Sequence, residues 1–87
     1  MIHTLEGNAE TRQCHLDGAL LDPRPSQRVW NHSPDGFNWG YGGSGPAQLA
    51  LAIVLAITGK ADGHQKFKWE VIAALPQDDD FRIEFEL

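Results

Sequence analysis

The sequence predicts an α+β fold in which a single small antiparallel β-sheet packs on one central apolar helix. Three observations favour this fold. An apolar segment over residues 47–58 lies between Pro46 and Gly59, as expected for a buried helix with a marked start and end. The segment Phe81–Leu87 alternates apolar and charged residues, which is typical of a strand with one buried face. The pair Asp17-Gly18 separates two short apolar segments and indicates a β-hairpin.

The size and composition of the chain limit its class. With 87 residues, it is expected to form a single domain over residues 1–87. It has one cysteine, no signal-peptide pattern, and a longest apolar run, Leu49–Ile57, far shorter than the ~20 residues that cross a bilayer. We therefore expect a cytoplasmic protein with no membrane partner. The formal net charge of −5 argues against direct nucleic-acid binding, which depends on Lys and Arg contacts to phosphate.

The N-terminal part of the chain is expected to hold two strands and a short return strand. The first strand is Met1–Glu6 and the second is Thr11–Leu16. An Asp-Gly turn, whose two residues both accept positive φ, would lead into a return strand at Ala19–Leu21. A loop is expected from Asp22 to Gly36, because its first two prolines lack backbone donors and bias their predecessors toward extended conformations.

The central helix is expected over Ala47–Thr58. Pro46 suits the first helical position, and either Ser44 or Gly45 would be the N-cap. Gly59 is placed to end the helix in a left-handed conformation. Because the helix is apolar nearly all round, it should be covered on most sides and form the centre of the fold.

The C-terminal part is expected to add two strands. Phe67–Ala73 alternates apolar and polar residues, which predicts a strand with Trp69 on its buried face. A turn over Leu75–Asp80 would connect it to the final strand, Phe81–Leu87. The predicted element order is therefore β-β-(β)-α-β-β.

A long central motif resembles a known family. Residues 31–51 run Asn-His-Ser-Pro-Asp-Gly-Phe-Asn-Trp-Gly-Tyr-Gly-Gly-Ser-Gly-Pro-Ala-Gln-Leu-Ala-Leu, and Phe-Lys-Trp-Glu-Val follows from residue 67. This pattern is similar to that of a family of small uncharacterised proteins from phages, prophages, bacteria and archaea, classified as a domain of unknown function. The resemblance covers the central and C-terminal parts of the chain. It implies no known activity, but it implies a mobile-element gene that is often phage-borne.

The glycine-rich segment before the helix has two interpretations. Such a loop presents free N–H groups and the positive end of the helix dipole, so it could bind a small anion or a nucleotide. The dinucleotide fingerprint is not met, because no long strand precedes the glycines, and Pro46 follows where a phosphate-binding loop has a lysine. In the structural interpretation, the glycines let aromatic side chains pack close to the backbone. The ligand-binding candidates are Tyr41, Gly42, Gly43 and Ser44.

The sequence predicts neither an enzyme nor a metal or cofactor site. His32, Ser33 and Asp35 lie within one turn, which rarely arranges a nucleophile, a base and an orienting group along a line. The four histidines show no metal-ligand spacing, and a single cysteine supplies no thiolate cluster.

The C-terminal carboxylates are the main candidate for partner binding. Three aspartates lie in the expected turn, and Glu84 and Glu86 share a strand face ~7 Å apart. Glu70, on the strand expected beside them, would extend this face. Such a row can imitate phosphates and occupy a nucleic-acid-binding groove, or it can simply be a solvated, edge-protecting sheet face. Trp30 is the expected aromatic anchor, and His32 lies near it in the central loop. The predicted partner-binding residues are therefore Asp78, Asp79, Asp80, Glu84, Glu86, Glu70, Trp30 and His32.

Two functions remain open from the sequence. The first is a small acidic phage-type protein that binds and inhibits a host protein, with a CRISPR complex or another nucleic-acid-binding defence effector as the expected target. The alternative is a binding module for a small anionic ligand or nucleotide at the glycine-rich helix start. An unpaired strand edge at Phe81–Leu87 would also suit a homo-oligomer.

Overall fold

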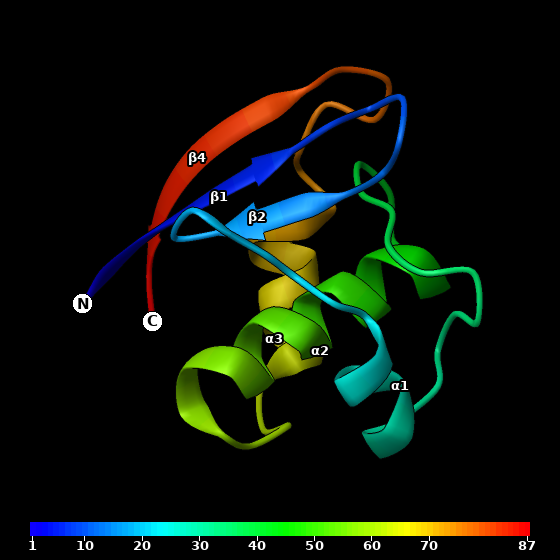
Figure 1. The fold of residues 1–87 in the computed structure, drawn as a ribbon, viewed down its shortest axis with the longest axis vertical. Coiled ribbons are helices and arrows are strands. Elements are labelled where there is room, and N and C mark those ends of the chain that lie inside the picture. Colours follow the sequence, from blue (N-terminus) through cyan, green and yellow to red (C-terminus); the bar gives the residue numbers. More distant parts are fainter.

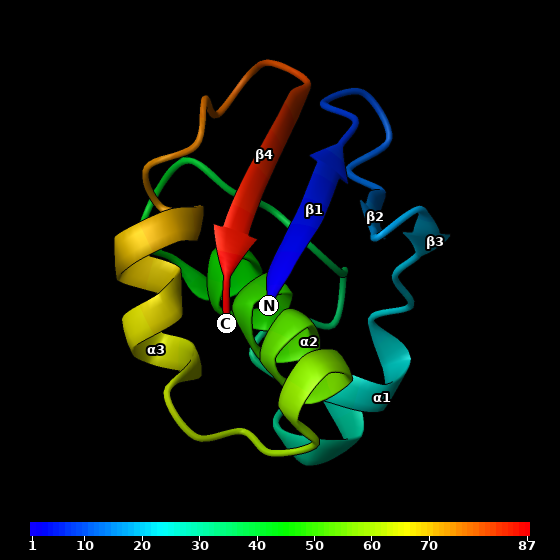
Figure 2. The ribbon, with the colours of Figure 1, turned by 90° about the vertical axis from the view of Figure 1, so that its left-hand side faces the viewer.

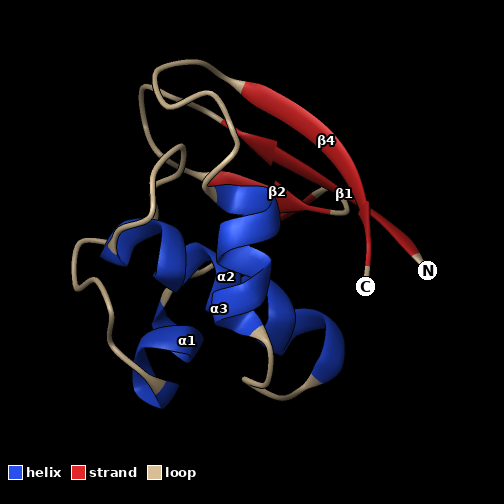
Figure 3. Cartoon of the chain, turned by 180° about the vertical axis from the view of Figure 1, so that it is seen from behind, coloured by secondary structure: helices blue, strands red, loops and turns tan.

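Four strands form one antiparallel sheet, and the helices lie against one of its faces (Figures 1 and 3). The computed structural model describes residues 1–87. The strands are β1 (Ile2–Gly7), β2 (Cys14–Leu16), β3 (Ala19–Leu20) and β4 (Phe81–Glu86), in the order β3-β2-β1-β4. The N-terminal and C-terminal strands are therefore neighbours, paired from Ile2 with Glu86 to Gly7 with Phe81. This architecture confirms the predicted α+β class.

The predicted hairpin connects β2 to β3. Asp17 and Gly18 have φ values of 51° and 83°, as a tight turn between right-twisted strands requires. Leu16 pairs with Ala19 across this turn.

The central helix, α2 (Ser44–Thr58), is confirmed and starts earlier than expected. All ten residues from Gly45 to Val54 are buried. In Figure 2 the helix lies between the other helices and beneath the sheet. Gly43 is the N-cap, so the expected caps Ser44 and Gly45 are wrong: both already lie in the first turn, and no side chain caps the helix. Gly59 ends it with φ 77°, as predicted.

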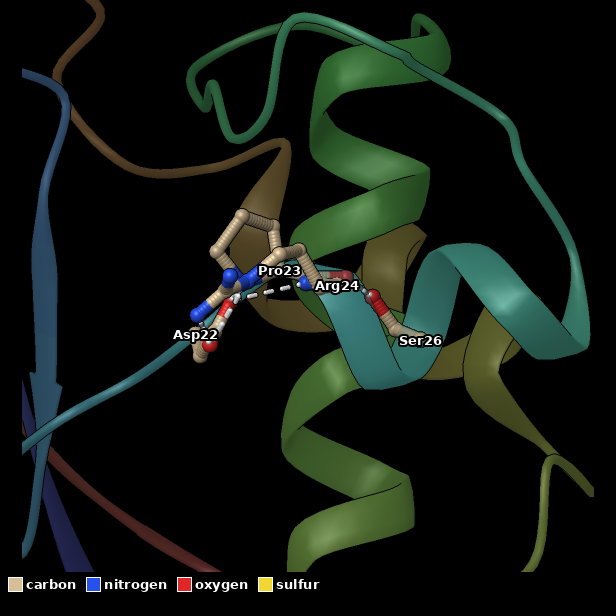
Figure 4. A network of polar contacts seen from close by, with 4 residues as sticks. All are labelled: Asp22, Pro23, Arg24 and Ser26. Carbon is tan, nitrogen blue, oxygen red and sulfur yellow. Dashed lines mark hydrogen bonds and ion pairs between the residues drawn. The ribbon is translucent and has the colours of Figure 1, made fainter.

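Residues Arg24–Val29 form a short helix, α1, where a loop was expected. The prolines do not prevent it, because Pro23 is the N-cap and Pro25 lies in the first turn, where a missing N–H costs no helical hydrogen bond. The Asp22 carboxylate accepts hydrogen bonds from the Arg24 backbone and guanidinium, and the Ser26 hydroxyl donates to the Pro23 carbonyl at 2.6 Å (Figure 4). Side chains thus order the helix start.

The predicted strand at residues 67–73 is wrong. This segment is helical: α3 (His64–Phe67) continues into a π-helical turn, η1 (Lys68–Ile72). The Ala73 N–H donates to the Lys68 carbonyl at 2.8 Å, the five-residue step that defines a π-turn. Phe67 and Ile72, also five residues apart, are both buried, whereas the Trp69 side chain expected in the core is 61% exposed.

The core lies between the sheet and α2. Trp39 is fully buried, and its indole packs edge-on against Phe81 at 4.9 Å. Cys14 is also buried, and burial raises the pKa of its thiol to about 12, so it acts as an apolar filler. No helix has the length and apolar composition needed to cross a membrane.

Candidate functional site

Two histidines that are distant in sequence meet beside an exposed tryptophan. Trp30 follows α1, His32 lies in the loop after it, and His64 begins α3. The two Nε2 atoms of the histidines are 3.0 Å apart. The Trp30 ring stacks on His32 with centroids 4.7 Å apart and meets His64 edge-on at 5.9 Å. The end of α1, the loop after it and the start of α3 therefore meet at these three side chains.

The hydrogen-bond partners fix the roles of the histidine nitrogens. His64 Nδ1 lies 2.8 Å from the Ala61 carbonyl, which can only accept, so Nδ1 carries a hydrogen. In a neutral His64 the Nε2 atom is then an acceptor, and the hydrogen in the 3.0 Å contact belongs to His32 Nε2. Burial, His64 and Lys68, in that order, lower the pKa of His32 below its ordinary value.

The loop that carries His32 is held by a buried glutamine of α2. The Gln48 side chain is fully buried, and its Oε1 accepts the Ser33 N–H at 2.9 Å. Its Nε2 donates to the Ser26 hydroxyl at 2.9 Å and to the Trp30 carbonyl at 3.2 Å. This network positions the loop by hydrogen bonds to the central helix, and no buried side-chain polar atom of the structure is left without a partner.

The same region extends to a second tryptophan. Lys68, one helical turn after His64, is largely buried, and its Nζ lies 4.4 Å from the centre of the Trp69 ring. This is a cation–π contact that keeps a positive charge beside an exposed aromatic side chain.

Two glycines of the central loop, Gly42 and Gly43, lie against aromatic side chains. A Cβ atom at Gly42 would overlap the Trp69 indole, and one at Gly43 would overlap the Tyr41 ring. Tyr41 to Ser44, the residues predicted for ligand binding, therefore lie together at the start of α2, but aromatic rings occupy the space over two of the glycines. This supports the structural interpretation, and ligand binding there stays a prediction.

Three exposed aromatic side chains lie along this region, and we call them the aromatic surface: Trp30, Tyr41 and Trp69. They are 57%, 38% and 61% exposed. The Trp30 ring contacts His64, and Lys68, one helical turn after His64, contacts the Trp69 ring. The Trp69 ring in turn lies against Gly42, the residue after Tyr41.

A family model described as a family of unknown function (DUF6166) matches residues 3–86. The chain belongs to DUF6166. The match covers nearly the whole domain and confirms membership of an uncharacterised family. No curated protein and no solved structure gives a significant match.

The acidic residues of this DUF6166 member are less concentrated than the sequence predicted. Glu84 and Glu86 are exposed on β4, as expected. Glu70 does not extend their face, because it lies on η1, where its carboxylate is 3.8 Å from the Lys66 amine. In the turn before β4, one Asp80 oxygen accepts the Ala9 N–H at 2.7 Å, so this carboxylate also orders the β1–β2 connection.

Several residues of the site were missed in the sequence. His64 lies in a polar connection with no motif, and Trp69 was assigned to the core. Gln48 offered one signal, since it is the only polar residue between Pro46 and Thr58. A polar residue within a fully buried helix must find hydrogen-bond partners, which predicts a contact to a loop.

Proposed function

We propose that this DUF6166 protein is a non-catalytic protein-binding module whose partner contacts the aromatic surface. The observation that carries the proposal is the exposure of two tryptophans and a tyrosine that are related through His64, Lys68 and Gly42. Tryptophan and tyrosine are enriched among the residues that dominate binding energy, and buried contact with them is worth far more than with surrounding polar residues.

The anchoring of this surface supports the proposal. The Trp30 carbonyl is bound to Gln48, and the Trp30 ring lies on two histidines that are bound to each other. The Trp69 ring is held between the Lys68 amine and Gly42. Side chains that are ordered before binding lose less conformational entropy when the partner arrives.

The histidine contacts favour a positioning role over catalysis. His32 Nε2 is engaged by His64, and the backbone N–H of Ser33 is engaged by Gln48. Since His32 Nε2 carries the hydrogen of this contact, Nδ1 is its proton-accepting nitrogen, and no serine hydroxyl is hydrogen-bonded to Nδ1 as an activated nucleophile would be.

A finer proposal is that the partner is a host protein, inhibited by this binding, and that the context is phage counter-defence against a nucleic-acid-binding effector. Its support is the net charge of −5 and the exposed Glu84 and Glu86, which would be attracted to a basic groove. The finer proposal would add the outer face of β4 to the contact.

The test is affinity capture from a lysate of the natural host with the wild type and five variants. Trp30→Ala and Trp69→Ala should each lose a protein that the wild type enriches, and the matched control Leu20→Ala, an exposed apolar residue on β3, should retain it. The captured protein is then purified and titrated directly. Equal affinity of the wild type and both tryptophan variants would refute the aromatic surface as the contact. Loss of affinity only with Glu84→Arg and Glu86→Arg would instead assign binding to the acidic face.

A further inference from the structure

Strand β4 forms an open edge of the sheet. It pairs with β1 on one side, and no backbone hydrogen bond joins it to any other segment. In Figure 3, no helix or loop crosses in front of it. Such an edge offers unpaired N–H and C=O groups to an incoming strand.

The register of the sheet determines which groups point to this edge. The Asp17 N–H donates to the Thr4 carbonyl at 2.8 Å, so Thr4 bonds toward β2. Bonding direction alternates along an antiparallel strand, so the odd-numbered residues of β1 bond toward β4. The contact of the Leu87 N–H with the Met1 carbonyl continues that alternation. The residues whose backbone groups point to the open edge are therefore Arg82, Glu84 and Glu86.

The side chains of β4 alternate in a way that suits a second strand. Phe81 and Phe85 are buried on the helix side, and Ile83 is half-buried there. Arg82, Glu84 and Glu86 are exposed on the outer face. An added strand would therefore need apolar residues on the inner face and charges of complementary sign on the outer face.

We propose that a second copy of this chain pairs through β4, antiparallel, with the two-fold axis at Ile83. In this register Arg82 of each copy lies directly opposite Glu84 of the other, so the two central outer pairs join opposite charges. On the inner face Ile83 meets Ile83, and Phe81 meets Phe85. The two four-stranded sheets become one continuous sheet.

Within Phe81–Glu86, this register places no like charges directly opposite one another, unlike its neighbours; Glu86 faces Asp80 just outside β4, where the Asp80 carboxylate already accepts the Ala9 N–H. The two β4 strands can form backbone hydrogen bonds only in registers that place Arg82, Glu84 or Glu86 of one copy opposite another of these residues in the second copy. Centring the pair on Glu84 places two carboxylates face to face, and centring it on Arg82 places two guanidinium groups face to face, which is destabilising. A strand that is self-complementary about its own centre is what a symmetric dimer requires. Two paired strands bury less than a standard interface of about 1,600 Å², so the dimer should be weak and concentration-dependent.

The proposal is tested by sedimentation velocity at low salt over a wide range of protein concentrations. The wild type should dimerise, and Arg82→Glu or Glu84→Arg alone should weaken the dimer about tenfold or more, because each places like charges opposite one another twice. The double variant Arg82→Glu/Glu84→Arg should restore dimerisation. Asp62→Arg, which reverses an exposed charge on the α2–α3 connection, should leave it unchanged. Circular dichroism confirms that each variant is folded.

Two results would overturn the inference: a wild type that stays monomeric at every concentration, or single reversals that leave the dimer intact. The register would be overturned if Arg82→Glu/Glu86→Arg restored the dimer and Arg82→Glu/Glu84→Arg did not. Residues 82 and 86 lie opposite one another only when the strands are centred on Glu84.

Discussion

Replacing the buried Gln48 by leucine should destabilise the domain strongly. Leucine has a similar volume, so the change leaves hydrogen-bond partners unsatisfied without opening a large cavity. The Ser33 N–H and the Trp30 carbonyl both lose their bond to Gln48, whereas Ser26 keeps its donation to Pro23. A buried polar group left unpaired costs ~1–3 kcal/mol, and the loop at Trp30 is partly open to water, so the expected total is about 2–4 kcal/mol.

That loss is a large part of the stability of a small domain, which is typically about 5–15 kcal/mol. Urea unfolding followed by circular dichroism measures it. With a slope of about 1 kcal/mol/M, the midpoint should fall by about 2–4 M while the slope stays constant. Gln65→Leu, at an exposed position on α3, is the matched control and should change the midpoint little. If Gln48→Leu costs less than about 1 kcal/mol, the network does not hold the loop as described.

Three further predictions follow from the contacts. The pKa of His32 lies below its ordinary value, so the unfolded chain binds more protons than the folded chain as the pH falls through that range. Stability should therefore drop as the pH is lowered through and below 6.5, the ordinary pKa of histidine, and the drop in urea midpoint should be smaller in His32→Gln; equal drops would contradict the assignment. Gly42→Ala should lower the melting temperature because its Cβ overlaps the Trp69 ring, and Trp69→Ala in the same chain should recover part of the loss; strictly additive effects would show that the two do not interact. Burial raises the pKa of Cys14 to about 12, so its thiol should react with iodoacetamide far more slowly in the folded protein than in urea, whereas similar rates would mean that the strand opens readily.

Elements with local signals were predicted well. The α2 helix has apolar residues all round, and its end at Gly59 needs only a left-handed glycine. The Asp17-Gly18 turn likewise depends on two residues that accept positive φ. In each case neighbouring residues determine the backbone, so distant contacts only complete what the local sequence favours.

Residues 67–73 were mispredicted because their apolar residues fit both the two-residue period of a strand and the five-residue step of a π-helical turn. Phe67, Trp69 and Val71 alternate as in a strand, yet Phe67 and Ile72 also share a face of a π-helical turn. The choice depends on what lies beside the segment, since α3 and η1 pack on α2 and the Phe67 ring packs on Phe85 of β4. Trp69 consequently changes from a core residue to an exposed one.

The candidate site depends even more on tertiary structure. Trp30 and His32 were singled out in the sequence, but His64 and Lys68 carry no motif that connects them to that loop. The 3.0 Å contact between the histidines joins residues 32 positions apart and exists only because α1 and α3 both pack on α2. No local rule encodes such a meeting.

The sequence by itself determined the α+β class, the buried helix, the hairpin and membership of an uncharacterised family, because periodicity and turn chemistry are properties of neighbouring residues and family similarity is a property of the sequence. Only the tertiary structure decided the helical state of residues 64–72, the exposure of Trp69, the histidine pair, and the removal of Glu70 from the acidic face. These depend on which surfaces of the chain meet across the central helix, and that is settled by packing over the whole domain.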